Sequence, residues 1–290
     1  MKYIDDFLEY LEVIRKHSNH TINNYRIDLI DFYEFNKEKI KNVDREIVNK
    51  YMQYLYDRNI SKATISRRLS SLRSFYNYLE KNGIVSKNYF SMVKNPKKEN
   101  GLPKFVKEVD VDKMFMIPDI RKPIGQRNLL IIRMLYATGV RVSELVNIKL
   151  SDIDINERII RIFGKGSKER VVVFGNNTKE ILELYLNNGR YRLSNGKNDY
   201  LFLNKDGEQL SDRYVRKILD DIIIKASIQT HVSPHMLRHT FATGMLNNGA
   251  DLVSVKEMLG HESLNTTSIY THVSDDKIRE IYNSAHPRAK

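Results

Sequence analysis

Four short segments of the sequence hold residue types that bind or transfer phosphate, and the first is a lysine between two glycines. Lys165 stands between Gly164 and Gly166, and Lys168 and Arg170 follow it closely. Such a loop can hold a phosphate, but the G-x-x-x-x-G-K-[ST] spacing of a P-loop is absent, and the segment connects two expected strands. An ordinary basic hairpin is the alternative explanation.

The second segment is Pro234-His235-Met236-Leu237-Arg238-His239-Thr240. Two histidines four residues apart share one face of a helix, which is a spacing that metal sites use. The glutamate of an H-E-x-x-H site is missing, because Met236 occupies its position, and the fixed charge of Arg238 opposes metal binding. Arg238 instead offers a planar fork for phosphate oxygens, and His235 lies on nearly the same face. A capping or core role is the alternative, above all for His239.

The remaining two segments place a charged or phenolic group beside a helix end. Arg141 follows the helix-stopping Gly139, and Glu144, three residues on, can hold its guanidinium. Gly260 is expected to end another helix, so the chain changes direction at His261, and Tyr270 follows nine residues later. The alternatives are a surface ion pair of little energetic value and a structural tyrosine, since the chain has 17 tyrosines.

The first hundred residues are expected to form helices. Ile4, Phe7, Leu8 and Leu11 recur at helical spacing and form one apolar stripe. Further helices are predicted to start at the N-caps Ser18, Asp44 and Ser61, and the last of them to stop at Gly83.

The outward face of the helix that begins after Ser61 is predicted to carry small hydroxyls mixed with arginines. This composition suits DNA phosphates and base edges, although a solvated helix face is the alternative. The residues of this face are Lys62, Thr64, Arg67, Arg68, Ser71 and Arg73.

Residues 86–104 read as a linker, and the part after it mixes helices with one pair of strands. The β-branched runs Arg158–Phe163 and Glu169–Phe174 predict a hairpin with Lys165 in its loop. We therefore expect a mainly α fold with a small antiparallel β-sheet. The expected helices are Val111–Ile117, Gln126–Ala137, Val142–Ile148, Lys179–Leu186, Asp212–Ala226, Pro234–Leu246, one from Asp251 to Gly260, and one from about Asn265 through Tyr270.

The charge balance indicates a polyanionic partner, most often nucleic acid. Lys+Arg number 48 against 36 Asp+Glu, a net charge of +12 with a pI near 9.5. The excess divides evenly, with +6 before residue 101 and +6 after it. No cysteine is present, which excludes disulfides, thiolate catalysis and Cys-type zinc sites. No apolar run approaches the roughly 18 residues of a membrane helix, and the start lacks a signal-peptide pattern, so we expect a cytoplasmic protein.

Taken together and in this order, the four segments resemble the tyrosine recombinase (phage integrase) family. The series that carries the resemblance is Ala137-Thr-Gly-Val-Arg141-Val-Ser-Glu144-Leu, Gly164-Lys165-Gly166, His235-Met-Leu-Arg238-His239-Thr240, Leu259-Gly260-His261 and Tyr270-Thr-His. The compact length and the ending His286-Pro287-Arg288-Ala289 are similar to the XerC/XerD branch of that family.

The resemblance implies an enzyme that cleaves and rejoins DNA through a covalent 3′-phosphotyrosine, with no metal, ATP or other cofactor. Arg141 and Arg238 would clamp the scissile phosphate, Lys165 would reach the cleavage site, His235 and His261 would assist proton transfer, and Tyr270 would attack. DNA contacts are expected from Lys62, Thr64, Arg67, Arg68, Arg73, Lys168 and Arg170.

The resemblance also implies an organisation and a set of partners. Residues 1–85 would be a core-binding (SAM-like) domain and 105–290 the catalytic domain, the two forming a C-shaped clamp on DNA. Residues 275–290 would be a segment exchanged between subunits, and a helix that folds back on its own domain is the alternative. A homotetramer or a heterotetramer with a second recombinase would act on a specific site in the nucleoid, with a translocase of the FtsK type as a possible activator. The role would be chromosome-dimer resolution at cell division. The alternatives are a mobile-element integrase, a type IB topoisomerase and a non-catalytic DNA-binding protein.

Overall fold

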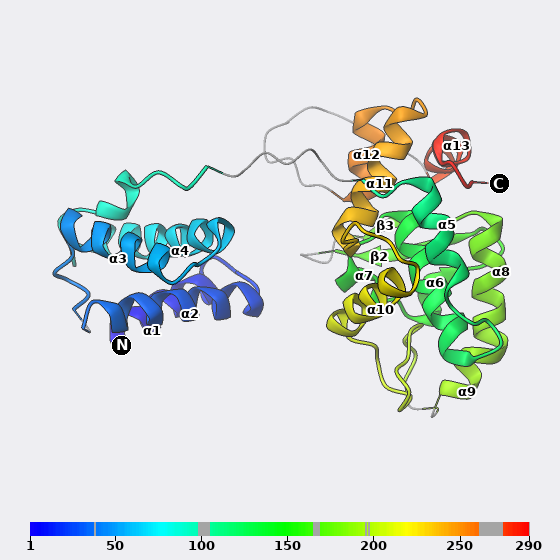
Figure 1. The fold of residues 1–290 in the computed structure, drawn as a ribbon, viewed down its shortest axis with the longest axis horizontal. Coiled ribbons are helices and arrows are strands. Elements are labelled where there is room, and N and C mark those ends of the chain that lie inside the picture. Colours follow the sequence, from blue (N-terminus) through cyan, green and yellow to red (C-terminus); the bar gives the residue numbers. More distant parts are fainter. Residues whose placement is uncertain are drawn as a thin grey trace. The chain divides into compact units, whose positions relative to one another are not determined.

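The structure is a computed structural model that describes residues 1–37, 39–97, 105–164, 169–194, 196, 198–260 and 275–289. The chain divides into two compact units, residues 1–102 and 103–290, and each is described by itself (Figure 1). Helices dominate both, and the described strands form one small antiparallel sheet, which confirms the predicted fold class. No helix in the described part of the chain is long and apolar enough to cross a membrane.

The described part of the first unit holds four α-helices, and the last three start after the predicted N-caps. The side-chain oxygens of Ser18, Asp44 and Ser61 each accept a hydrogen bond from the backbone N–H three residues on, which satisfies a donor that the first helical turn leaves unpaired. The helices are α1 (Lys2–Val13), α2 (Asn19–Phe35), α3 (Arg45–Asp57) and α4 (Lys62–Lys81).

The core of this unit is aromatic, and it includes a residue of the predicted linker. Phe90, in the short 3₁₀ helix Tyr89–Met92, is fully buried and meets the Phe32 ring edge-on at 5.1 Å. Asn88 accepts from the Phe90 amide and donates to the Arg73 carbonyl, while Arg73 donates to the carbonyls of Phe90 and Val93. Residues 88–93 of the predicted linker 86–104 therefore pack on the first unit, and their apolar residues Tyr89, Phe90, Met92 and Val93 follow neither a helical nor a strand period.

The second unit joins the three-stranded sheet β1 (Ile153–Asp154), β2 (Ile159–Phe163) and β3 (Glu169–Val173) to a set of helices. The predicted hairpin is present, with Phe163 opposite Glu169 and Ile160 opposite Val172. The two-residue β1 was not predicted, since so short a run has no alternation. The helices are α5 (Glu108–Met116), α6 (Pro123–Thr138), α7 (Val142–Val146), α8 (Asn176–Leu184), α9 (Tyr191–Leu193), α10 (Asp212–Lys225), α11 (Pro234–Asn247), α12 (Leu252–Leu259) and α13 (Asp275–Ala285), with a π-helical stretch at Tyr185–Arg190.

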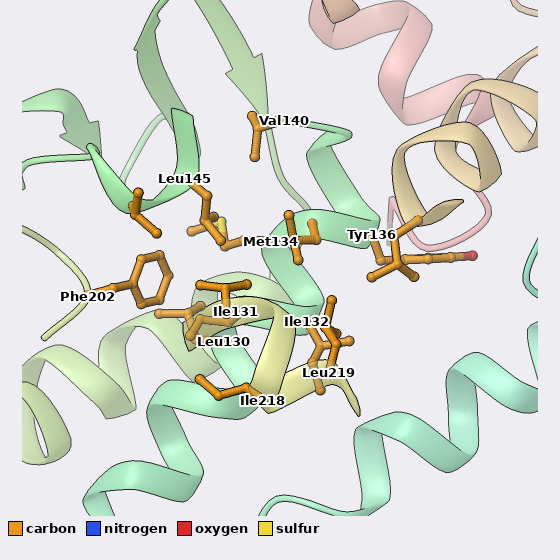
Figure 2. Close-up of a cluster of buried hydrophobic side chains, with 14 of the residues drawn as sticks. Leu130, Ile131, Ile132, Met134, Tyr136, Val140, Leu145, Phe202, Ile218 and Leu219 are labelled. Atoms are coloured by element: carbon orange, nitrogen blue, oxygen red, sulfur yellow. The ribbon is translucent and has the colours of Figure 1, made fainter. Parts of the chain in front are cut away.

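Helix α6 lies at the centre of the second unit. Leu130, Ile131 and Ile132 are consecutive and all fully buried, so other elements cover this part of the helix on every side (Figure 2). Helices α5, α7, α8, α10 and α11 pack around it. A separate apolar cluster joins α11, α12, β3 and α13, with Phe241 and Tyr282 among its members.

Helix α13 and the residues after it pack against their own unit. Tyr282 is 2% exposed, and the Arg288 guanidinium lies 2.6 Å from the Asp112 carboxylate and 3.3 Å from that of Glu108. Residues 275–289 of the predicted exchange segment 275–290 pack on the same chain in this single-chain structure, and exchange between subunits stays a prediction.

Candidate active site

The turn between α6 and α7 places the first candidate arginine. Gly139 closes α6 in the left-handed conformation (φ +61°), and a Cβ there would lie 2.6 Å from the Phe241 ring, so the turn is built for glycine. Arg141 then forms the N-cap of α7. Glu144 accepts from both the backbone amide and the guanidinium of Arg141, at 2.8 and 2.7 Å. The predicted pair is present, but Glu144 is buried, so this is no surface ion pair.

Arg238, on α11, is buried and donates to two backbone carbonyls. One nitrogen lies 2.7 Å from the Gly139 oxygen and the other 2.5 Å from the Leu259 oxygen. Burial, reinforced by the positive charge of Arg141, lowers the pKa of Arg238 to about 10. That value is still far above neutrality, so the Arg238 guanidinium remains charged at neutral pH.

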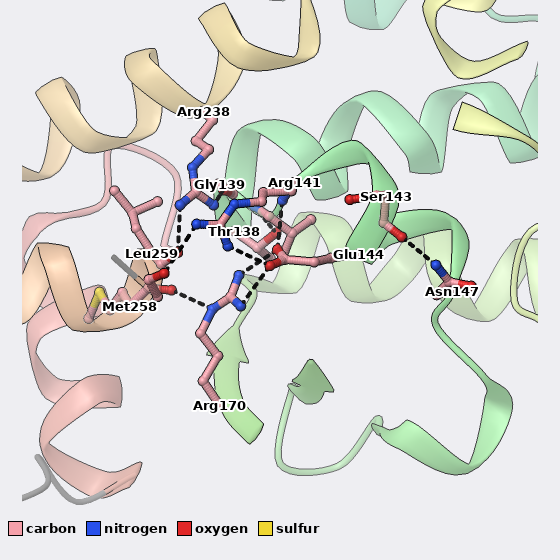
Figure 3. Close-up of polar contacts among 12 residues, drawn as sticks. Thr138, Gly139, Arg141, Ser143, Glu144, Asn147, Arg170, Arg238, Met258 and Leu259 are labelled. Carbon is pink, nitrogen blue, oxygen red and sulfur yellow. Dashed lines mark hydrogen bonds and ion pairs between the residues drawn. The ribbon is translucent and has the colours of Figure 1, made fainter. Parts of the chain in front are cut away.

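Arg170, on β3, completes a cluster of three arginines around Glu144 (Figure 3). Its two terminal nitrogens lie 3.0 and 2.7 Å from the two Glu144 oxygens, and its Nε donates to the Met258 carbonyl at 3.0 Å. Burial raises the pKa of Glu144, but the hydrogen bonds from Arg170 and from the Arg141 amide outweigh it, and the pKa lies below its ordinary value. Arg170 was expected to contact DNA, whereas its guanidinium points into the protein.

A pocket of about 310 Å³ opens beside this cluster. Arg141, Arg238 and His235 all line it, so three of the six predicted catalytic residues, from two helices far apart in the sequence, meet at one cavity. Pro234 and the N-cap Ser233 start α11 and put the exposed His235 in its first turn.

Three further ionisable residues of this pocket were missed: Arg216, Asp220 and His231. The His231 Nδ1 lies 4.0 Å from an Asp220 carboxylate oxygen, and Arg216 lies 3.2 Å from Asp212. Arg216 and Asp220 occupy the polar side of α10, whose apolar residues are buried. Nothing in their spacing distinguishes them from ordinary solvated charges. Only the folded structure reveals them, because it brings them to the same pocket as His235.

Four of the other predicted site residues lie outside the described residues. These are Lys165, Lys168, His261 and Tyr270. Their flanks are described: Phe163 and Glu169 pair at the end of the hairpin, and α12 ends at Gly260 in the left-handed conformation (φ +63°). Among the residues that the structure does describe, no three His, Asp or Glu side chains gather as a metal site would require.

The predicted DNA-facing side of α4 is not one continuous exposed face. Ser71 is 2% exposed and donates to Asp28, a fully buried carboxylate of α2. Arg67 lies 2.5 Å from the same carboxylate with 41% of its side chain exposed, while Arg68 lies 2.5 Å from Asp31 with only 12% exposed. The outward placement of Ser71 and Arg68 was therefore wrong, because α2 covers that side of α4. Arg73 also points inward, onto the carbonyls of the 3₁₀ helix.

The Asp28 carboxyl has a pKa above its ordinary value, because burial raises it. The Ser71 hydrogen bond and the charges of Arg67 and Arg68 limit that rise. Lys62 and Thr64 lie at the start of α4, where Lys62 is exposed and the Thr64 hydroxyl lies 2.9 Å from that of Ser61.

Comparison with known proteins agrees with this arrangement. The profile of the Phage integrase family matches residues 104–277, and that of the Phage integrase N-terminal SAM-like domain matches residues 4–83. The chain belongs to the phage integrase family. Its relatives include a protein named tyrosine recombinase XerC from Oceanobacillus iheyensis, 46% identical over 99% of this chain and 96% of the relative. Another of that name, from Bacillus subtilis, is 40% identical over 99% and 97%.

Solved structures of similar fold include a XerH site-specific recombinase bound to a palindromic difH substrate in a post-cleavage complex. It is 28% identical, with a TM-score of 0.70 over 97% of this chain and 83% of that one. This chain is accordingly a tyrosine recombinase of the Xer type, a site-specific DNA recombinase. The order of its motifs predicted the family, and its length and ending predicted the branch.

Proposed function

We propose that this recombinase cleaves and rejoins DNA strands through a covalent 3′-phosphotyrosine at Tyr270. The observation that carries the proposal is the convergence of Arg141, Arg238 and His235 on one pocket of about 310 Å³. Two guanidinium groups can grip one phosphate from two directions with bidentate hydrogen bonds, which a single charged side chain cannot do.

The chemistry suits fixed cations. Attack on a phosphodiester forms a five-coordinate phosphorane whose equatorial oxygens gain negative charge, and the two arginines stabilise that charge without a metal. By analogy with the loss of an oxyanion-hole donor, removal of either would slow cleavage by about 10²–10³. Glu144 and the backbone carbonyls hold both guanidinium groups before DNA arrives.

The remaining roles are assigned to residues that the family pattern supplies. The Tyr270 oxygen attacks phosphorus, and the bond from phosphorus to the 5′ oxygen breaks. A histidine, His235 or His261, accepts the phenol proton, whose pKa is ordinarily near 10, and Lys165 gives a proton to the departing 5′ oxygen. The products are a 3′-phosphotyrosine and a free 5′ hydroxyl. Because the covalent bond keeps the energy of the phosphodiester, rejoining runs the same steps in reverse without ATP.

The partner is double-stranded DNA carrying a specific recombination site. Two units, each with a net charge of +6 or close to it, would close on the duplex as a clamp, with residues 1–85 as the core-binding domain and 105–290 as the catalytic domain. Exposed candidates for phosphate contact in the first unit are Lys62 and Arg67.

We place the protein in the resolution of chromosome dimers at cell division, acting in the cytoplasm on the nucleoid. It would work as a tetramer, either of one chain or with a second recombinase, that exchanges residues 275–290 between subunits, with a DNA translocase as activator. The names of the curated relatives support this role. Integration of a mobile element is the second candidate, since solved integrases from a phage and a transposon share the fold.

The test is a nicked duplex carrying the cognate site, incubated with the protein in EDTA. Cleavage releases a short strand across the nick and traps the covalent complex, so we expect a protein–DNA adduct that Tyr270→Phe abolishes. An adduct that survives Tyr270→Phe, or cleavage that requires magnesium, would contradict the mechanism. Site-specific binding without any adduct would favour a non-catalytic protein, and relaxation of any supercoiled plasmid by the monomer would favour a topoisomerase.

A further inference from the structure

The last turn of α12 is held by three arginines, one for each of three consecutive backbone carbonyls. Arg170 Nε donates to the Met258 oxygen at 3.0 Å, Arg238 to the Leu259 oxygen at 2.5 Å, and Arg141 to the Gly260 oxygen at 3.1 Å. The final carbonyls of a helix lack intrahelical partners and carry the negative end of its dipole, so cations are favoured there. The chain continues from this turn directly into His261.

Arg170 differs from the other two arginines in what it faces. It stands opposite the buried Ile162 in the sheet, on the side that faces the protein interior, and only 14% of its side chain is exposed. Arg141, by contrast, is 42% exposed. Arg170 is also not among the described residues that line the pocket.

The partners of Arg170 connect three parts of the site. Its fork binds both oxygens of Glu144, the same carboxylate that holds Arg141, and its Nε binds the end of α12. Contact with Gly260 is equally close, since a Cβ built on that glycine would lie 3.1 Å from Arg170 Nη1. The guanidinium therefore links β3, the Arg141 turn and the residue that precedes His261.

We propose that Arg170 is a positioning residue for strand cleavage and makes no contact with DNA; this inference rests on the proposed function. By holding Glu144 and the end of α12 together, it sets where the segment from His261 to Tyr270 begins relative to Arg141 and Arg238. Turning Arg170 outward to a phosphate would leave the buried Glu144 with one of its two cationic partners, which is strongly unfavourable. A nucleophile displaced by about 1 Å reacts more slowly by a factor on the order of 10².

The test compares Arg170→Met and Arg170→Lys with Arg161→Met in single-turnover cleavage of the nicked duplex at saturating protein. Arg161 is the matched control, because it lies on the outer side of the same sheet with 61% of its side chain exposed. We expect Arg170→Met to lower the cleavage rate constant by about 10²-fold at unchanged Kd, because the adduct chemistry depends on alignment. The cleavage rate constant of Arg170→Lys should stay close to that of Arg170→Met, since an ammonium cannot bridge two carboxylate oxygens and a carbonyl. Arg161→Met should cleave like the wild type.

Two outcomes would overturn the proposal. One is weaker binding by Arg170→Met, with a salt slope lower by about 1 and a normal rate constant at saturation, as a phosphate contact requires. The other is a normal rate constant with a reduced final amount of adduct, which would mean that the variant only misfolds in part. Wild-type protein that forms no adduct would instead refute the proposed function.

A double variant separates positioning from charge balance. Arg170→Met combined with Glu144→Gln removes both charges, so the burial penalty of a carboxylate left with Arg141 as its one cationic partner disappears, and the melting temperature should rise above that of Arg170→Met. The rate constant should stay low, because the link to α12 is still absent. Recovery of cleavage together with stability would show that Arg170 only neutralises Glu144, contrary to the proposal.

Discussion

At the scale of single residues, the polar groups of this protein act in buried clusters. Glu144 is 7% exposed and holds two arginines, and the fully buried Asp28 holds Arg67 and Ser71. A buried charge is tolerated only with close partners. Each of these carboxylates therefore fixes the side-chain conformations of the residues that bind it.

His286 provides a test of such burial that is independent of catalysis. The ring stacks on Tyr282 at 4.7 Å, lies near Tyr136 and Phe241, and accepts a hydrogen bond from the Arg288 amide; the Glu108 and Arg288 charges are close by. Burial lowers its pKa from 6.5 to about 4. Between these values the unfolded chain binds the proton and the folded chain does not, so stability falls as pH falls.

We therefore expect the unfolding free energy to drop by up to about 3 kcal/mol on account of His286 as pH falls from 6.5 to 4. His286→Phe should remove that part of the pH dependence in chemical denaturation measured across this range. His231→Phe is the control, because that ring is 79% exposed. Equal pH profiles for wild type and His286→Phe would show that the buried ring does not carry the effect.

At the scale of elements, the site depends on where helices stop. Gly139 ends α6 just before Arg141, its carbonyl accepts from Arg238, and Gly260 ends α12 where the three arginines meet. Both glycines adopt positive φ, which gives the chain a sharp change of direction that other residues adopt at a cost.

Gly139→Ala should be far more harmful than the same change at Gly83. Both have similar positive φ, so each substitution carries a backbone cost of about 1 kcal/mol. Nothing lies within 4 Å of a Cβ at Gly83, whereas one at Gly139 would lie 2.6 Å from the Phe241 ring and 2.9 Å from Leu259. We expect an additional loss of about 1–3 kcal/mol for Gly139→Ala in thermal or urea unfolding, together with slower cleavage. Equal losses at the two positions would mean that α6 and α11 can separate without cost.

At the scale of the whole molecule, the positive charge is distributed over both units. An excess of Lys and Arg before and after residue 101 cannot come from one basic tail. Phosphate contacts by such a protein release counterions from DNA, so affinity must depend on salt.

Binding of the full chain to its site should therefore weaken steeply with salt. For six to ten phosphate contacts the affinity falls by about 10³–10⁵ between about 50 and 200 mM salt. The Tyr270→Phe variant is the appropriate protein for this titration, because cleavage would otherwise trap the complex. Fluorescence anisotropy of a labelled duplex gives the slope, and a Kd insensitive to salt would contradict phosphate contacts as the main source of affinity.

The helix starts and the β-hairpin were predictable because their causes are local. Ser18, Asp44 and Ser61 cap helices with their own side chains, and Phe163 pairs with Glu169 across a short loop. The alternation in β3 also contained a signal that was not used. Val172 faces the core, so Arg170, two residues earlier, had to face it too and needed an internal partner.

The sequence by itself determined the class of chemistry, since the order and spacing of Arg141, Lys165, His235, Arg238, His261 and Tyr270 identify the family that the comparisons show. Only the tertiary structure decided which partners the inward-facing polar groups meet. Arg68 and Ser71 look like surface residues in the helix pattern, and the strand pattern turns Arg170 inward without giving its partner. Helices α2, α7 and α12 bring Asp31, Asp28, Glu144 and the Met258 carbonyl to them. The physical reason is that periodicity reports the exposure of one element alone, whereas a buried charge is stabilised by a partner from another.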